Sequence, residues 1–292
     1  MRGRAIGLFG VAFPFAPAIL IPAAQWMMDT WGWRSVFWGA GLAVTLLVTL
    51  PALLLLRRRP EDVGLYPDGA EGPADLVAGG RRRRGGDNNF TATEAMRTPT
   101  FWFLVGSQFL GVFISGSVSF HLAAYLGDVG IATAVIGLAI SLYSITNGLS
   151  SGLWGYLSER ISERYIGMGA TALGGVIALL LMGVNGPLVA VVLTALYGLG
   201  VRGGNSTLGL IIAQYYGRQS YGAINGTLVP IGYVGLGIGP LIGSMLYDAS
   251  HNYSTFLWML VALHALNVVF FGLALPPRLP ARLANAPTAN QP

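Results

Sequence analysis

The seventeen basic residues of this 292-residue chain are all arginines, and they are unevenly distributed among the breaks between its long apolar stretches. Fifteen lie at the start of the chain, in alternate breaks or at its end, namely Arg2, Arg4, Arg57, Arg58, Arg59, Arg81, Arg82, Arg83, Arg84, Arg97, Arg160, Arg164, Arg218, Arg278 and Arg282. The other breaks contain only Arg34. Cytoplasmic loops of membrane proteins retain Arg and Lys, whereas translocated loops are depleted of them. This asymmetry therefore predicts a chain that crosses a bilayer repeatedly, with both termini in the cytoplasm.

The composition supports a membrane protein. Apolar residues make up 53% of the chain and charged residues only 10%, whereas a soluble domain usually carries about a quarter charged residues. The formal charge of +5 comes from arginines in the breaks, so we attribute it to an anionic lipid surface and not to nucleic acid. There is no Cys, and the three His show no metal-ligand spacing. We therefore expect neither a metal site nor a cofactor.

A helix needs roughly 20 apolar residues to cross about 30 Å of hydrocarbon. The sequence meets this criterion eight times, at residues 5–28, 35–56, 101–125, 131–155, 165–184, 187–212, 220–246 and 254–276. The arginine-poor breaks are short, which predicts antiparallel neighbours. Trp26, Trp31, Trp33 and Trp38 lie around the first of them, which is typical of an aromatic belt. We expect an all-α polytopic protein with eight transmembrane helices in a cell membrane, either inner or plasma membrane.

One break is much longer than the others and divides the chain. It runs from Arg57 to Arg97 and is rich in Gly, Pro, Asp and Arg. Such a composition has no apolar face to bury, so it predicts a flexible basic linker on the cytoplasmic side. The expected organisation is two helices at 1–56, a linker at 57–98, six helices at 99–276 and a disordered cytoplasmic tail at 277–292.

The seventh predicted helix has an unusual distribution of glycine and proline. Gly235, Gly239 and Gly243 recur every four residues, while Pro230 and Pro240 interrupt the same stretch. Residues spaced by four share one face of a helix, and a glycine face allows another helix to approach closely. Two interpretations remain open, a static packing surface and a surface on which helices slide or rock. Both place this helix inside a bundle.

Two loops resemble those of the major facilitator superfamily of membrane transporters. Trp33-Arg34 and the segment 57–69 (RRRPEDVGLYPDG) are similar to the sixth helix and central loop of that family. The likeness is greatest to its bacterial branch of monocarboxylate and oxalate/formate carriers. Residues 155–164 (GYLSERISER) resemble the repeated cytoplasmic motif in its copy after helix eight. This copy is degenerate, because Ser162 replaces a Gly and Glu163 replaces a base.

A third segment resembles the same family. Residues 216–226 (YGRQSYGAING), followed by Gly239-Pro240, are similar to the loop and helix after the family's helix ten. The family has twelve helices, six on each side of its central loop. This chain resembles helices five to twelve only, which is an incomplete major-facilitator fold with two helices of the N-terminal half and the complete six-helix C-terminal half. It could be a fragment, a mis-called start or a decayed gene.

The resemblance implies secondary active transport of a small organic solute, with a monocarboxylate as the favoured class and a proton or another ion as a possible coupling partner. In this family two bundles rock around a substrate site near the midplane. Two alternatives remain open. One is efflux of a lipophilic compound, although the family's antiporter signature in helix five is not matched by residues 10–22. The other is a non-transporting membrane fragment or assembly partner. An intramembrane enzyme would need a nucleophile–base pair or a metal site, and the sequence contains no such motif.

Arg202 is the best single candidate for substrate binding. It lies about fifteen residues into the sixth predicted helix, roughly 22 Å from its outer end. Asn205 and Ser206 follow at three and four residues and therefore share its face. Arg can bind a carboxylate through two parallel hydrogen bonds, so this stripe is suited to an organic anion. Alternatively, Arg202 reaches the inner surface or is neutralised by helix-end carbonyls or by Glu159.

Uncharged polar side chains in other predicted helices are further candidates. Tyr143 and Asn147 lie in the fourth helix and Gln108 in the third. Each of them could hold a polar substrate or join two helices. His121 and His264 could relay protons or serve as structural hydrogen-bonding groups.

A separate role is predicted for the degenerate cytoplasmic motif. Gly155, Glu159, Arg160 and Arg164 lie at the inner ends of two predicted helices. Charged residues at such positions could latch the bundle in one state by pairing across it. Exposed ion pairs contribute about 0–1 kcal/mol each, so the latch would bias a conformational equilibrium without determining the fold.

Overall fold

The computed structural model describes residues 20, 23–24, 26–55, 90–158, 160–217 and 220–280. Its named elements are α2 (Trp33–Val44), η1 (Thr45–Thr49), α3 (Leu50–Leu55), α5 (Ala92–Met96), α6 (Pro99–Asp128), α7 (Thr133–Leu157), α8 (Glu163–Leu181), α9 (Pro187–Tyr216), α10 (Tyr221–Ser250) and α11 (Ser254–Leu273). Within the described residues there are helices and no strand. Seven of the described helices are long and apolar enough to cross a membrane. The all-helical, multi-pass prediction is therefore confirmed, while most of the predicted span 5–28 lies outside the described residues.

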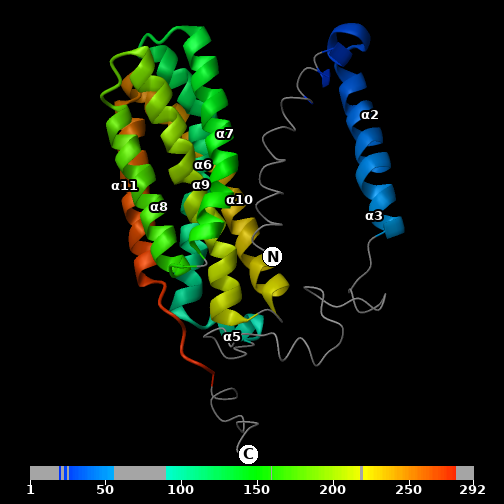
Figure 1. The fold of residues 1–292 in the computed structure, drawn as a ribbon, viewed down its shortest axis with the longest axis vertical. Coiled ribbons are helices and arrows are strands. Elements are labelled where there is room, and N and C mark those ends of the chain that lie inside the picture. The colour runs from blue at the N-terminus through cyan, green and yellow to red at the C-terminus, as the bar shows by residue number, and fades with distance from the viewer. Residues whose placement is uncertain are drawn as a thin grey trace, which may run out of the picture. The chain divides into compact units, whose positions relative to one another are not determined.

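Contacts divide the chain into two units (Figure 1). In the first unit, α2, η1 and α3 together form one apolar span, Trp33–Leu54. The most apolar stretch of this span contains no buried residue. The turn η1 is a π-helix that lies just before Pro51. A proline has no N–H to donate to the preceding turn, and a widened turn is one way for a helix to accommodate this loss.

Two of the tryptophans predicted to form an aromatic belt contact each other in the first unit. The rings of Trp26 and Trp31 meet edge to face with centroids 5.0 Å apart. The guanidinium of Arg34 lies 4.5 Å from the centre of the Trp33 ring, which is a cation–π distance. Trp31, Trp33 and Trp38 are all more than half exposed. This arrangement fits side chains that occupy a membrane–water interface.

The second unit is a bundle of the six helices α6 to α11, which run alongside one another in alternating directions (Figure 1). The most extensive contacts are between α7 and α9, α6 and α10, α8 and α9, and α8 and α11. Helix α9 also contacts α6 and α10, and the ring of its Tyr197 lies 5.8 Å from the ring of His264 on α11, so it touches all five other helices. Residues on α9 are therefore central to this unit.

The ends of the helices show why the chain turns where it does. Pro99 and Pro187 lie in the first turns of α6 and α9. Backbone N–H groups in a first turn have no partner within the helix, so proline costs no hydrogen bond there. Thr98 caps α6 by accepting a hydrogen bond from the Phe101 amide. Gly130 and Gly217 have φ values of 81° and 83°, which favour glycine because it lacks a Cβ.

The predicted glycine face of α10 packs against α6. A Cβ on Gly235 would lie 2.7 Å from the Phe109 carbonyl oxygen, and one on Gly239 would lie 2.6 Å from the Phe113 carbonyl oxygen. A Cβ on Gly243 would lie 2.6 Å from the His121 ring. The prediction that this face lies inside a bundle is therefore confirmed. The sliding interpretation stays a prediction.

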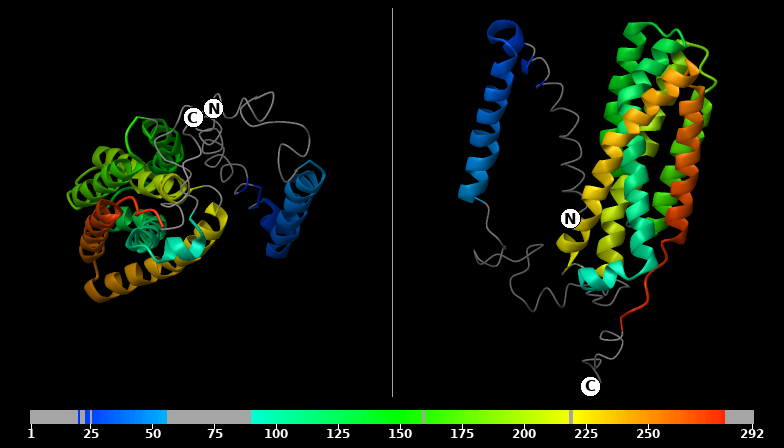
Figure 2. Two further views of the ribbon diagram at one scale, coloured as in Figure 1. Left: turned by 90° about the horizontal axis from the view of Figure 1, so that it is seen from below. Right: turned by 180° about the vertical axis from the view of Figure 1, so that it is seen from behind.

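The end of the predicted linker, residues 90–98, is ordered against the second unit. Helix α5 begins with a capping box in which Thr91 and Glu94 satisfy each other's backbone amides. It lies at the end of the bundle where α6 begins (Figure 2). The Phe90 amide donates to the Tyr216 carbonyl at 3.1 Å, and the hydroxyls of Thr98 and Tyr216 are 2.7 Å apart. The first of these contacts satisfies a carbonyl at the carboxyl end of α9, and together they join this end to the start of α6.

Candidate functional site

Arg202 lies in α9 as predicted, but its side chain lies outside the described residues. Asn205 is half-buried and points toward α6, because its Oδ1 would lie 2.1 Å from a Cβ placed on Gly111. Ser206, the next residue on α9, is also half-buried. Thus the two described members of the predicted stripe are accommodated within the bundle and are not fully exposed to lipid.

Several polar residues of α7 face α9. The Asn147 side-chain amide donates to the Gly198 carbonyl at 3.4 Å. Nearby, the Thr146 hydroxyl donates to the Ala195 carbonyl at 2.6 Å. Tyr143 is buried, and a Cβ on Gly198 would lie 2.5 Å from its carbonyl oxygen. The structure therefore gives this group a helix-joining role, and its predicted substrate role stays a prediction.

Trp154 extends the same contact and was not singled out in the sequence. Its indole N–H donates to the Leu199 carbonyl at 2.9 Å. Helix α7 thus makes three side-chain hydrogen bonds to consecutive parts of the α9 backbone. Gly198 makes the close approach of α7 to α9 possible, because it has no Cβ that would separate the two backbones.

Gln108 lies between α6 and α10. Its Cγ and Nε2 atoms would each be 2.9 Å from a Cβ on Gly232, so the side chain fills the space that this glycine leaves. Gln108 is half-buried. Its position is compatible with either of the predicted roles, substrate binding or helix packing.

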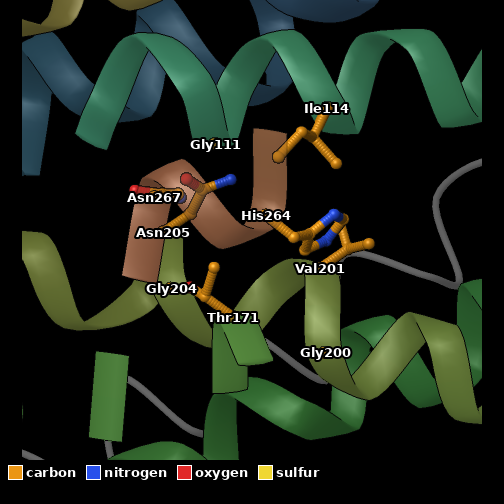
Figure 3. A pocket seen from close by; sticks show the side chains of 9 residues that line it. All are labelled: Gly111, Ile114, Thr171, Gly200, Val201, Gly204, Asn205, His264 and Asn267. Atoms are coloured by element: carbon orange, nitrogen blue, oxygen red, sulfur yellow. The ribbon is translucent and has the colours of Figure 1, made fainter. Parts of the chain in front are cut away.

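A second polar group lies where α6, α8, α9 and α11 meet, around a small cavity (Figure 3). The cavity is lined by Gly111, Ile114, Thr171, Gly200, Val201, Gly204, Asn205, His264 and Asn267. The Ser107 hydroxyl donates to the Asn267 side-chain oxygen at 2.6 Å. His264 is 2% exposed, and its Nδ1 lies 2.8 Å from the Leu260 carbonyl oxygen.

Of this second group, the sequence pointed only to His264 and Asn205. Asn267 could have been found, because it follows His264 by three residues and so shares its helix face. Ser107 and Thr171 gave no signal, since isolated hydroxyl residues in apolar helices are common. Their importance depends on which helices become neighbours.

His121 lies in a cluster of aromatic residues near the end of α6. Its Nε2 lies 2.9 Å from the Pro240 carbonyl oxygen and its Nδ1 lies 3.4 Å from the Tyr253 hydroxyl. Burial raises the pKa of Tyr253, with a further contribution from Tyr247 and Asp128. Tyr253 therefore stays protonated and can donate to the His121 ring. Both ring nitrogens thus have partners, as a structural histidine requires.

The described part of the predicted latch contacts tyrosines. The guanidinium of Arg160 lies 4.9 Å from the centre of the Tyr156 ring, and that of Arg164 lies 5.0 Å from the Tyr165 ring. Gly155 has open space where a Cβ would be placed. Glu159 lies outside the described residues, so the proposed pairing of charges across the bundle stays a prediction.

No group of three His, Asp or Glu residues that could hold a metal ion occurs within the described ranges.

Comparison with known proteins gives two findings. The model of the Major Facilitator Superfamily matches residues 1–132 and 108–292. The chain is also 23% identical over 162 residues to the oxalate:formate antiporter of Oxalobacter formigenes. That match covers 56% of this chain and 35% of the antiporter, so the chain spans only about a third of the length of this relative.

Proposed function

Since this chain belongs to the Major Facilitator Superfamily, we propose that it is a secondary active transporter of a small organic solute that works by alternating access. The observation that carries the proposal is the family match at both ends of the chain, together with seven described helices able to cross a membrane. The likeness to an oxalate:formate antiporter supports a small carboxylate as the substrate class, with a monocarboxylate preferred.

The proposed architecture follows the family's order of helices. In it, α6 to α11 form the six-helix C-terminal half, and the span Trp33–Leu54 with one preceding helix belongs to the N-terminal half. The chain would then have eight transmembrane helices in an inner or plasma membrane. The distribution of arginines supports a cytoplasmic location for both termini and for the linker.

We assign substrate binding to polar residues on three helices, namely Arg202, Asn205 and Ser206 on α9, Tyr143 and Asn147 on α7, and Gln108 on α6. Support comes from the contacts of α9 with both α6 and α7. An arginine at membrane depth is unfavourable by about 2.5–3.5 kcal/mol on insertion scales. Arg202 is therefore expected to face protein, water or an anionic substrate in preference to lipid.

Uptake of radiolabelled formate, acetate and lactate into proteoliposomes that contain the full chain tests this function. The key variants are Arg202→Ala, which removes the cation, and Arg202→Lys, which keeps the charge but loses the bidentate geometry. Arg278→Ala is the matched control, because Arg278 is exposed beyond the end of α11. We expect the unmodified chain to take up a labelled carboxylate. Arg202→Ala should reduce this uptake at least tenfold and Arg202→Lys should reduce it partly, whereas Arg278→Ala should leave it unchanged.

Other outcomes separate the alternatives. Equal uptake by the Arg202 variants and the unmodified chain would retain transport and exclude Arg202 as the anion site. Saturable transport of a lipophilic dye without carboxylate uptake would favour efflux. Absence of uptake of every solute would favour a non-transporting membrane protein that requires a partner.

A further inference from the structure

Among the described residues, several polar side-chain atoms that line the small cavity between α6, α8, α9 and α11 have no protein hydrogen-bond partner. Its size corresponds to roughly one water molecule. Two of its lining residues, His264 and Asn267, are 2% and 3% exposed and lie on the same face of α11. Buried polar groups are almost always hydrogen-bonded, so the unused groups of these side chains indicate what the cavity binds.

The hydrogen bonding of His264 determines what it offers to the cavity. Its Nδ1 lies 2.8 Å from the Leu260 carbonyl oxygen, and a carbonyl can only accept. Nδ1 therefore carries the proton, and Nε2 of the neutral ring is an acceptor. Nε2 is directed toward the contact between α8 and α9, because it would lie 2.5 Å from a Cβ on Gly174.

Asn267 offers the complementary group. Its Oδ1 accepts the hydrogen bond from Ser107 at 2.6 Å, which leaves the hydrogens of its amide nitrogen to donate. Within the described part of the chain, the side chains of Asn205 and Thr171 also line the cavity and form no hydrogen bond there. An occupant must therefore donate to His264 and accept from Asn267.

We propose that this cavity is a binding site for one structural water molecule, which donates a hydrogen bond to His264 Nε2 and accepts one from the Asn267 amide. Water meets both requirements at once and fits the volume. A metal cation does not, because the amide hydrogens of Asn267 would repel it. The additional polar groups of Asn205 and Thr171 complete the two to four partners that a buried water usually has.

The bound water connects α11 to two helices, α8 and α9, whose backbones approach each other at glycines. It links α11 to the junction of α8 and α9, where Gly174 and Gly200 bring the two backbones together. Helix α9 also carries Arg202 and Asn205. The water thereby fixes the position of the helix that bears these residues, and this role is independent of whether the chain transports a solute.

Water-edited solid-state NMR on the full chain in lipid nanodiscs, with ¹⁵N-labelled histidine, tests the proposal. The chain has three histidines, so the ring signals can be assigned with His121→Gln and His251→Gln variants. We expect an unprotonated Nε2 at His264 that receives magnetisation from water. Val201→Ile adds one methylene to a residue that lines the cavity and should reduce this transfer several-fold.

Val189→Ile is the matched control, because Val189 lies on the same helix and is exposed. It should leave the His264 signal unchanged. The proposal is wrong if the His264 ring in the unmodified chain receives no magnetisation from water at a mixing time at which transfer to the exposed His251 ring is complete. It is also wrong if Nε2 of His264 is protonated. Unaltered transfer in a folded Val201→Ile protein would also contradict it. If that variant does not fold, the result for the unmodified chain decides.

Discussion

Two helix pairs in the second unit are held together by different means. Helices α6 and α10 meet at Gly235 and Gly239, where the two backbones are in direct contact, and at Gly243, which accommodates the His121 ring. Helices α7 and α9 are joined by side-chain hydrogen bonds from Thr146, Asn147 and Trp154 to backbone carbonyls. Lipid is as apolar as a leucine side chain, so close packing and interhelical hydrogen bonds must stabilise both pairs.

The difference has a consequence for movement. A hydrogen bond to a particular carbonyl fixes the register of α7 on α9, because a shift of one helical turn would break it. A row of glycines presents a nearly smooth surface, along which α10 can shift while contact is retained. The hydrogen bond between His121 and the Pro240 carbonyl limits the shift of α10 at one end of the contact. We therefore expect α7 and α9 to move together and α10 to be the more mobile partner of its pair.

The largest expected effect comes from blocking the glycine contact. In Gly239→Leu, the new Cβ would lie 2.6 Å from both the Phe113 carbonyl oxygen and the Ser117 hydroxyl, so α10 must separate from α6. Overpacking usually destabilises by about 1–3 kcal/mol, and a clash with backbone should reach or exceed the upper value. Thermal unfolding in detergent, monitored by tryptophan fluorescence, measures the effect.

Gly237→Leu is the control for this prediction. Gly237 lies on the same helix two residues away and has open space around it. We expect its unfolding temperature to stay within about a degree of the unmodified value, since exposed substitutions usually change stability by about 0.5 kcal/mol or less. Equal destabilisation by both leucines would show that the glycine face is not the contact surface.

A smaller effect is expected from Thr146→Val, which preserves the shape of the side chain and removes its hydroxyl. The lost hydrogen bond to Ala195 is 2.6 Å long. Interhelical hydrogen bonds in membranes contribute on average about 0.6 kcal/mol and at most about 1.7 kcal/mol. Ser144→Ala is the control, because the hydroxyl of this exposed serine donates to the Ile140 carbonyl of its own helix. If both variants unfold alike, hydrogen bonding does not hold α7 to α9.

The smallest effect on stability is expected from Asn147→Leu. Its hydrogen bond to Gly198 is 3.4 Å long, near the limit for such an interaction, so the unfolding free energy should fall by less than about 0.6 kcal/mol. Carboxylate uptake should nevertheless fall at least several-fold if Asn147 also contacts substrate. A variant with a normal unfolding temperature and normal uptake would remove Asn147 from the substrate site.

The positions of most helices could be predicted from hydropathy. The predicted spans 187–212 and 254–276 correspond closely to α9 (Pro187–Tyr216) and α11 (Ser254–Leu273). Helix α6 extends beyond its predicted span at both ends, because backbone hydrogen bonding continues where the apolar stretch stops. The short helix α5 was not predicted. Its five residues are too few to show periodicity, and it depends on packing against the bundle.

Candidate sites were harder to predict than helices. In lipid, both the buried and the exposed faces of a helix can be apolar, so hydropathy does not reveal which face meets a neighbour. The glycine spacing of α10 correctly indicated an interhelical face, because small residues have a direct steric effect. The pairing of Ser107 with Asn267 joins residues 160 positions apart, and no local pattern encodes it.

Exchange transport most directly tests the central claim that this chain is itself a carrier. Proteoliposomes that contain the full chain are preloaded with unlabelled lactate, and entry of labelled lactate is compared with entry into vesicles loaded with gluconate. An alternating-access carrier returns faster with substrate bound, so we predict a several-fold stimulation by internal lactate. Formate and acetate are tested in the same way. Entry no faster than into protein-free liposomes, for all three solutes and both loadings, would contradict the account.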